Sequence, residues 1–216
     1  VWGEHAAYHD GKYDPFWEAC QDLGIVIHFH SGPAPHSEYF GPAFPTEDRS
    51  DELPGAMGAY VSEVMFWLYR PLTFMLWGGV FERFPRLKAM VVEGGTMFMV
   101  PSWLMLLDHN YTDVQFSAKL GDFRSHLSMA PSEYFARNCG IGASCVPRRD
   151  LDLKDQIGLK QIMWGSDFPH PEGTWPNTAQ YYVDTFKGFD ADAGRQILGE
   201  NAIQFYGLDG DYLNSL

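Results

Sequence analysis

Cysteine is nearly absent from this chain. Only three occur in 216 residues, Cys20, Cys139 and Cys145, and no two of them stand at CxxC spacing. A disulfide-stabilised extracellular fold needs several paired cysteines, and a structural zinc site built from cysteines needs closely spaced ones. The scarcity therefore excludes both and predicts a reducing compartment, which favours a cytoplasmic protein.

Basic residues are also scarce. The chain has 15 Lys and Arg against 28 Asp and Glu, which gives a formal net charge of −13 at pH 7. Such a surface repels phosphate backbones and anionic lipid, so we expect no nucleic-acid and no membrane partner. A small-molecule substrate remains as the expected partner, and the charge does not identify it, because a cleft can differ in charge from the rest of the surface.

Long hydrophobic runs are missing as well. The most apolar stretch, residues 64–80, is broken by Arg70 and Pro71 and is too short to cross a bilayer comfortably. It therefore predicts a buried amphipathic helix. Its aromatic part, residues 66–77, fits a helix packed on a partner subunit of a homo-oligomer, and it fits packing in the core equally well.

Several catalytic motifs are not found. The glycine pairs at 78–79 and 94–95 lack GxGxxG or P-loop spacing, which argues against a doubly wound nucleotide-binding sheet. Neither the GxSxG motif of serine hydrolases nor the HExxH motif of zinc proteases occurs. Cys139 and Cys145 flank a predicted strand, and we interpret them as small core residues rather than nucleophiles.

What the sequence does contain is an alternation of short β-branched segments with helical ones. Strands are predicted at 25–30, 87–93, 139–145 and 161–166, and helices at 14–23, 56–76, 101–109, 134–138, 177–186 and 192–205. Asp14 is the expected N-cap of the first helix. This order predicts an α/β fold of parallel βαβ units in a single domain spanning 1–216. The long segments after the strands, 31–55, 110–130 and 167–176, favour a TIM (β/α)₈ barrel, which builds its active site there. Four units make half of a barrel, so we expect the N-terminal half to be missing.

Two residues at predicted strand ends have the chemistry of metal ligands. His28 and His30 lie two apart on one strand and therefore face the barrel interior together, with His30 at the level of the active site. Asp167 ends the fourth strand, where a carboxylate can bind a metal and also accept a proton from water that the metal activates. We therefore predict that His30 and Asp167 are metal ligands. For His28 a hydrogen-bonded structural role and a role in substrate binding both stay open.

Other polar residues lie close to these two in the predicted fold. Glu93 ends the second strand and is a candidate acid/base or metal-facing carboxylate, with a salt bridge at the barrel mouth as the alternative. His170, Glu172 and Trp175 follow Asp167 on the same loop. We interpret these three as candidate substrate-binding residues, although loop residues also commonly lie on the surface.

Taken in order, the motifs resemble the amidohydrolase-related family of the second amidohydrolase type, which includes aminocarboxymuconate-semialdehyde decarboxylase. The motifs are YDPFW at 13–17, GIVIHFHSG at 24–32, GGVFERFPRLK at 78–88, EGG at 93–95, WGSDFPHP at 164–171 and GENA at 199–202. The resemblance implies that the four strands are strands five to eight of a TIM barrel, with His30 and Asp167 as the metal ligands of strands five and eight. It also implies an HxH ligand pair on strand one, which this chain lacks. Many relatives have a catalytic histidine where this chain has Glu93.

The function expected from these residues is that of a metal-dependent hydrolase acting on a small amide, ester or lactone. The expected cofactor is one divalent metal, zinc first and manganese as the alternative. Asp167 would accept a proton from the attacking water, while Glu93 or His170 would orient the substrate or assist the leaving group. A metal-dependent non-oxidative decarboxylase of an aromatic or dienoic acid is the alternative within the fold. An inactive fragment or binding remnant is the alternative of another class.

Overall fold

The structure, a computed structural model, describes residues 5–30, 55–93, 98–113 and 117–215. At its centre is a four-stranded sheet in the order β1-β2-β3-β4, formed by β1 (Val26–Phe29), β2 (Lys88–Val91), β3 (Cys139–Ser144) and β4 (Ile162–Gly165). Every neighbouring pair is parallel. The four strands were all predicted, and each is one to three residues shorter than its predicted segment.

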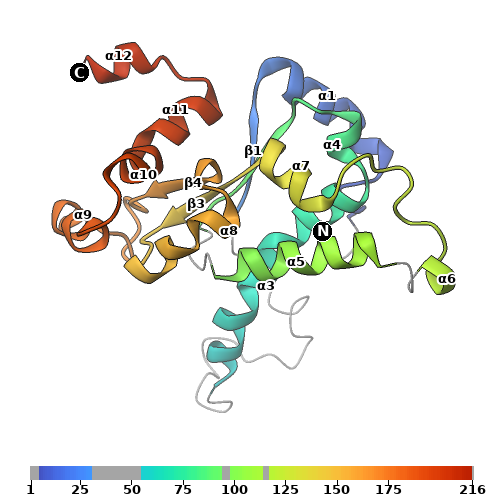
Figure 1. The fold of residues 1–216 in the computed structure, drawn as a ribbon, viewed down its shortest axis with the longest axis horizontal. Helices are drawn as coiled ribbons and strands as arrows, with labels where there is room; N and C mark the ends of the chain where they lie inside the picture. Colours follow the sequence, from blue (N-terminus) through green and yellow to red (C-terminus); the bar gives the residue numbers. More distant parts are fainter. Residues whose placement is uncertain (1–4, 31–54, 94–97, 114–116, 216) are drawn as a thin grey trace.

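Helical segments connect successive strands, as parallel pairing requires (Figure 1). The longer ones are α1 (Asp14–Leu23), α3 (Ala56–Trp77), α5 (Met99–Thr112), α7 (Pro131–Asn138) and α9 (Thr178–Phe186). Short ones are η1 (Gly11–Tyr13), α4 (Val80–Arg83), α6 (Ser117–Leu120), η3 (Arg148–Leu153), α8 (Lys154–Ile157) and η4 (Leu159–Gln161). The helix predicted at 192–205 is divided into α10 (Ala191–Arg195), a π turn η5 (Gln196–Glu200) and α11 (Asn201–Tyr206), and α12 (Gly210–Asn214) follows. Residues 31–54 of the loop predicted at 31–55 lie outside the described residues, as does the pair at 94–95.

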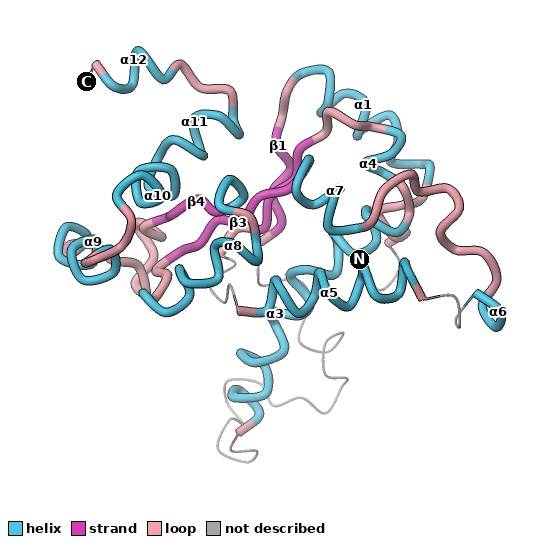
Figure 2. Tube along the Cα trace, in the orientation of Figure 1, coloured by secondary structure: helices cyan, strands magenta, loops and turns pink. Residues whose placement is uncertain are grey.

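The two faces of the sheet are covered differently. On one face, alternate strand residues such as Val91, Ile141 and Ile162 are fully buried in a core shared with α3, α5 and α7. Met90 and Met163 point to the opposite face, where Phe205 and Tyr206 of α11 lie against the strands. Figure 2 shows α10 and α11 on the other side of the strands from α3, α5 and α7. This second face is the one that a closed barrel would turn inward.

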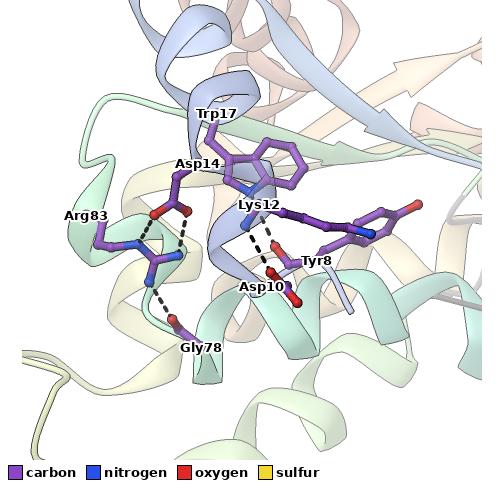
Figure 3. A network of polar contacts seen from close by, with 7 residues as sticks. All are labelled: Tyr8, Asp10, Lys12, Asp14, Trp17, Gly78 and Arg83. Carbon is purple, nitrogen blue, oxygen red and sulfur yellow. Dashed lines mark hydrogen bonds and ion pairs between the residues drawn. The ribbon is translucent and has the colours of Figure 1, made fainter. Parts of the chain in front are cut away.

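A half-exposed arginine ties α1 to the corner between α3 and α4 (Figure 3). Arg83 donates two hydrogen bonds to the Asp14 carboxylate, at 3.1 and 2.9 Å, and one to the carbonyl of Gly78 at 2.8 Å. Asp14 is therefore the first residue of its helix and a partner of Arg83, whereas we had predicted it as the N-cap. Nearby, the Trp17 indole donates to the Tyr8 carbonyl at 3.3 Å.

Buried asparagines fix the starts of two strands. The Asn138 amide, 1% exposed, donates to the carbonyls of Pro85 and Leu87 just before β2. Asn201, 2% exposed, does the same for Leu159 and Ile162 at the start of β4. The side-chain amides thus satisfy backbone carbonyls at the strand starts, where the bonds to Leu87 and Ile162 are buried and an unpaired carbonyl would be penalised.

We predict that Asn138→Ala lowers the free energy of unfolding by about 2–4 kcal/mol, because the buried Leu87 carbonyl and the partly buried Pro85 carbonyl lose their donor and a small cavity opens. Urea unfolding of the variant and the parent chain measures this difference. Asn214→Ala, at an exposed position in α12, is the matched control and should stay within about 0.5 kcal/mol. An Asn138 variant as stable as the control would show that the amide contributes little.

Within the part of the chain that the structure describes, no helix is both long enough and apolar enough to cross a membrane.

Candidate active site at the strand ends

Four chemically active residues lie where the four strands end. His30 follows β1, Glu93 lies two residues beyond β2, Cys145 follows β3, and Asp167 lies two residues beyond β4. Parallel pairing aligns these ends, with Phe29 opposite Val91 and Ser144 opposite Gly165. The fold therefore gathers side chains that are up to 137 positions apart in sequence at one edge of the sheet.

Three of these residues have a backbone conformation that is rare for side chains other than glycine. Glu93, Cys145 and Asp167 have φ values of +53°, +50° and +59°, all in the left-handed region. Each costs on the order of 1–3 kcal/mol and persists only when its surroundings enforce it. The same left-handed conformation occurs at the ends of β2, β3 and β4. We infer that the fold accepts this backbone strain because it sets the directions of the three side chains at this edge.

The polar side chains here form a connected series. His30 Nε2 lies 3.0 Å from Glu93 Oε1, and Asp167 Oδ2 lies 3.4 Å from His170 Nδ1. Burial, followed by the nearby Glu93 carboxyl group, raises the pKa of Asp167. Two carboxyl groups this close repel each other when both are ionised, so a proton or a cation between them would be favourable.

A cavity of about 320 Å³ opens at this edge. His30, Glu93 and Asp167 line it together, so the structure brings the two predicted metal ligands and the predicted acid/base residue into one site. Met163 and Tyr206 also line it. The cavity combines an apolar part with a polar edge, an arrangement typical of a small-molecule site.

The remaining predicted site residues do not line this cavity. His28 does not line the cavity; its Nε2 lies 2.9 Å from the Tyr206 hydroxyl, and burial lowers its pKa. This contact matches the hydrogen-bonded structural role that the sequence left open. On the loop after β4, His170 contacts Asp167, and Glu172 is exposed and donates its backbone N–H to His170 Nδ1 at 3.4 Å. Trp175, 68% exposed, packs edge-to-face on Phe168. The substrate-binding roles of all four remain predictions.

Cys145 is the residue whose position sequence reasoning missed. Cys139 is fully buried, as expected of a core residue, but Cys145 is half-buried, and its Sγ lies 3.8 Å from the Glu172 carbonyl. Burial and the charges of Asp167, Glu172 and Glu93 raise the pKa of its thiol. Our interpretation of it as a core residue is therefore wrong, because it lies at the strand's C-terminal end beside the carboxylates. Its place directly after β3 was the available signal.

The donor atoms at this edge suit a divalent metal. An imidazole nitrogen and carboxylate oxygens are ligands that both zinc and manganese accept. Among residues 5–30, 55–93, 98–113 and 117–215, however, no three side chains of the ligand types are grouped closely enough to hold an ion by themselves. The described residues therefore fit a divalent metal in the kind of donor atom that they offer, and they could supply only part of its ligands.

Comparison with known proteins places this site in a family. A family model described as amidohydrolase matches residues 1–208, nearly the whole chain. The chain belongs to the amidohydrolase family. Among curated proteins it is similar to 2-amino-3-carboxymuconate-6-semialdehyde decarboxylase of Dictyostelium discoideum, with 26% identity over 205 residues, 93% of this chain and 50% of that protein.

Solved structures of amidohydrolase relatives share the fold. The 5-carboxyvanillate decarboxylase of Sphingomonas paucimobilis matches with a TM-score of 0.69 and 22% identity, over 94% of this chain and 56% of that one. A dihydroxybenzoic acid decarboxylase from Polaromonas sp. with bound manganese matches with a TM-score of 0.63 and 19% identity, over 93% and 55%. This amidohydrolase chain thus spans about half the length of the relatives it matches. The α/β fold with a parallel sheet is confirmed, and its family members bind a divalent metal.

Proposed function

We propose that this amidohydrolase chain carries the catalytic edge of a metal-dependent, non-oxidative decarboxylase that acts on an aromatic or dienoic acid. The proposal revises the order of the sequence-based expectations, which put hydrolysis first. The relatives reported above are named as decarboxylases, and they support the carboxy-lyase reaction. In this proposal β1 to β4 are strands five to eight of a TIM barrel, and further ligands come from outside the described residues.

The observation that carries the proposal is the contact series His30–Glu93–Asp167 at the strand ends. His30 and Asp167 would hold the metal, with manganese or zinc as the ion. When bound, the ion would supply positive charge that stabilises an anionic substrate and the negative charge that develops during the reaction. Because Glu93 contacts both ligands, its carboxyl group is within reach of the same small volume.

The reaction requires one proton at a defined place. The bond between the ring or chain carbon and the carboxyl carbon breaks, carbon dioxide leaves, and the electron pair stays on the substrate carbon. That carbon then takes a proton, which we assign to the Glu93 carboxyl group. His30 and Asp167, which lie beside Glu93, orient its carboxyl group for this transfer.

The test is product analysis with the full-length gene product. A panel of 2-amino-3-carboxymuconate-6-semialdehyde, 5-carboxyvanillate and 2,6-dihydroxybenzoate is incubated in H₂¹⁸O with Mn²⁺ or Zn²⁺. We expect carbon dioxide release from at least one acid, one solvent-derived hydrogen on the carbon that carried the carboxyl group, and no more ¹⁸O in the organic product than in an enzyme-free control. Incorporation of ¹⁸O into the organic product would replace this proposal with hydrolysis.

Removing the metal gives a further prediction. Dialysis against a chelator should lower the decarboxylation rate by at least about 10³-fold, since an ion contributes several kcal/mol to charge stabilisation. Adding one equivalent of Mn²⁺ or Zn²⁺ should restore the rate. A chelated protein that keeps full activity would contradict the proposed role of the metal.

Hydrolysis of a small amide, ester or lactone is the second candidate, and one observation favours it. The Glu93 carboxylate lies beside His30 and Asp167, where it can accept a proton from water, and the family resemblance implies a histidine at this position in many relatives. In either reaction we propose a small molecule as the partner, which the acidic net charge supports.

A further inference from the structure

The loop after β4 crosses over its own beginning. The N–H of Thr174 donates to the carbonyl of Ser166 at 3.0 Å, which closes a loop around Asp167. Inside it, the N–H of His170 donates to the carbonyl of Asp167 at 2.8 Å, and the N–H of Gly173 donates to the carbonyl of His170 at 2.9 Å. The loop is thus a compact set of turns whose backbone groups satisfy one another.

The crossing leaves no room for a side chain at position 173. A β-carbon there would lie 2.7 Å from the carbonyl oxygen of Asp167, 2.8 Å from that of Ser166 and 3.0 Å from that of His170. Three backbone oxygens surround this one glycine, and backbone cannot move aside as a flexible side chain can. A residue larger than glycine would have to push apart the two backbone segments that cross here, and one of these segments contains Asp167.

Contacts on both sides of Gly173 fix the rest of the loop. A side chain at position 173 would therefore displace the backbone at Asp167. Thr174 is 7% exposed, and its hydroxyl lies 3.0 Å from the Thr178 hydroxyl at the start of α9. On the other side, the thiol of Cys145 contacts the carbonyl of Glu172, and the Cys145 N–H donates to the carbonyl of Gly165 at 3.3 Å. With both flanks anchored, a β-carbon at 173 presses on the backbone that holds Asp167 at its left-handed φ of +59°.

We infer that Gly173 is a positioning residue for Asp167: the close crossing that only glycine permits holds the Asp167 backbone in the conformation that places Asp167 in the cavity lining beside Glu93 and His30. This inference rests on the proposed metal role of Asp167. The contacts to be relieved in a Gly173→Ala variant are several tenths of an ångström too short, whereas metal–ligand distances tolerate only about 0.2 Å. Gly173 has no contact with the ion or the substrate in this account and acts through Asp167 alone.

Two control glycines separate positioning from general stability. At Gly78, beyond the end of α3 and outside the cavity lining, a β-carbon would lie 2.0 Å from His9 Cβ and 2.8 Å from the Phe74 carbonyl. Gly78→Ala should therefore destabilise the fold without touching the site. At Gly199 nothing lies within 4 Å of the added carbon, so Gly199→Ala should leave both stability and site unchanged.

The experiment measures Mn²⁺ affinity by isothermal titration calorimetry, thermal stability, and hydrogen exchange of the Thr174 amide without metal, in the full-length gene product and the three variants. We expect Gly173→Ala to bind Mn²⁺ about 10–100-fold more weakly, as when support around a metal ligand is lost, and to exchange the Thr174 amide faster. Gly78→Ala should lose stability and keep its affinity.

Each other outcome overturns the inference in a recognisable way. A Gly173→Ala protein with faster exchange and unchanged affinity shows that the loop does not position a ligand. Unchanged exchange shows that the crossing accepts a side chain, and an equal loss of affinity in Gly78→Ala shows that instability alone is responsible. If the parent protein binds no Mn²⁺ or Zn²⁺, the proposed function fails first, and the positioning role falls with it.

Discussion

His30→Gln is expected to lose the bound metal and to lower kcat by about 10³-fold or more. The imidazole is the only nitrogen donor at the described edge of the cavity, and an ion contributes several kcal/mol to charge stabilisation in reactions of this kind, with each 1.36 kcal/mol worth a factor of ten. Glutamine keeps a polar group of similar size near Glu93 but is a weak metal ligand. Metal content by mass spectrometry and steady-state kinetics measure the two effects.

The matched control for His30→Gln is His109→Gln. His109 lies near the end of α5 with its side chain 63% exposed, beside Asp113 and away from the cavity. We expect it to keep the parent metal content and rate. A His30 variant that still binds one equivalent of metal would remove this residue from the ligand set.

Glu93→Gln is expected to lower kcat by about 10²–10⁴-fold while the metal stays bound. General acid–base catalysis contributes a factor of this size, and an amide cannot deliver the proton that the substrate carbon requires. KM should change little, because the shape of the cavity is preserved. The pH dependence of kcat should also lose one limb, since the group that provides the proton is gone.

Glu18→Gln, at an exposed position of α1, is the control for the loss of one negative charge. Metal analysis of the Glu93 variant decides between its two possible roles. A variant that loses the metal together with the rate identifies Glu93 as a ligand, and one with full activity excludes the assigned proton transfer.

The fold was largely predictable because the sequence alternates between segments with the pattern of a strand and segments with the pattern of a helix. Short apolar segments that follow helical ones predicted all four strands. Helix α1 was predicted with both of its ends, because Pro15 suits its first turn and Gly24, at φ +66°, terminates it. Strand ends were less certain. Ladder pairing depends on the neighbouring strand, and periodicity within one segment does not report where that neighbour ends.

The helix predicted at 192–205 shows a different limit. Its sequence is helical throughout, yet the chain forms a π turn at Gln196–Glu200 and then redirects into α11. The cause is tertiary: Asn201 must reach the carbonyls at the start of β4, and Tyr206 must reach His28 and Met90. Local propensity contains no information about either partner.

At the site, the sequence predicted which residues lie together but not how they are held. His30, Glu93 and Asp167 each end a predicted strand, and the common edge of parallel strands was enough to group them. The left-handed backbone of Glu93, Cys145 and Asp167 could not be predicted, because this conformation is typical of glycine and none of the three is a glycine. The tight crossing at Gly173 depends on three carbonyls whose positions only the folded loop defines.

The most direct test of the central claim is anomalous diffraction from crystals of the full-length gene product grown with Mn²⁺. The account predicts one strong peak at the manganese edge, at bonding distance, roughly 2 Å, from both His30 Nε2 and an Asp167 carboxylate oxygen. A peak that touches neither side chain, or a peak held by only one of them, would contradict the claim that these two strand ends share a metal ion.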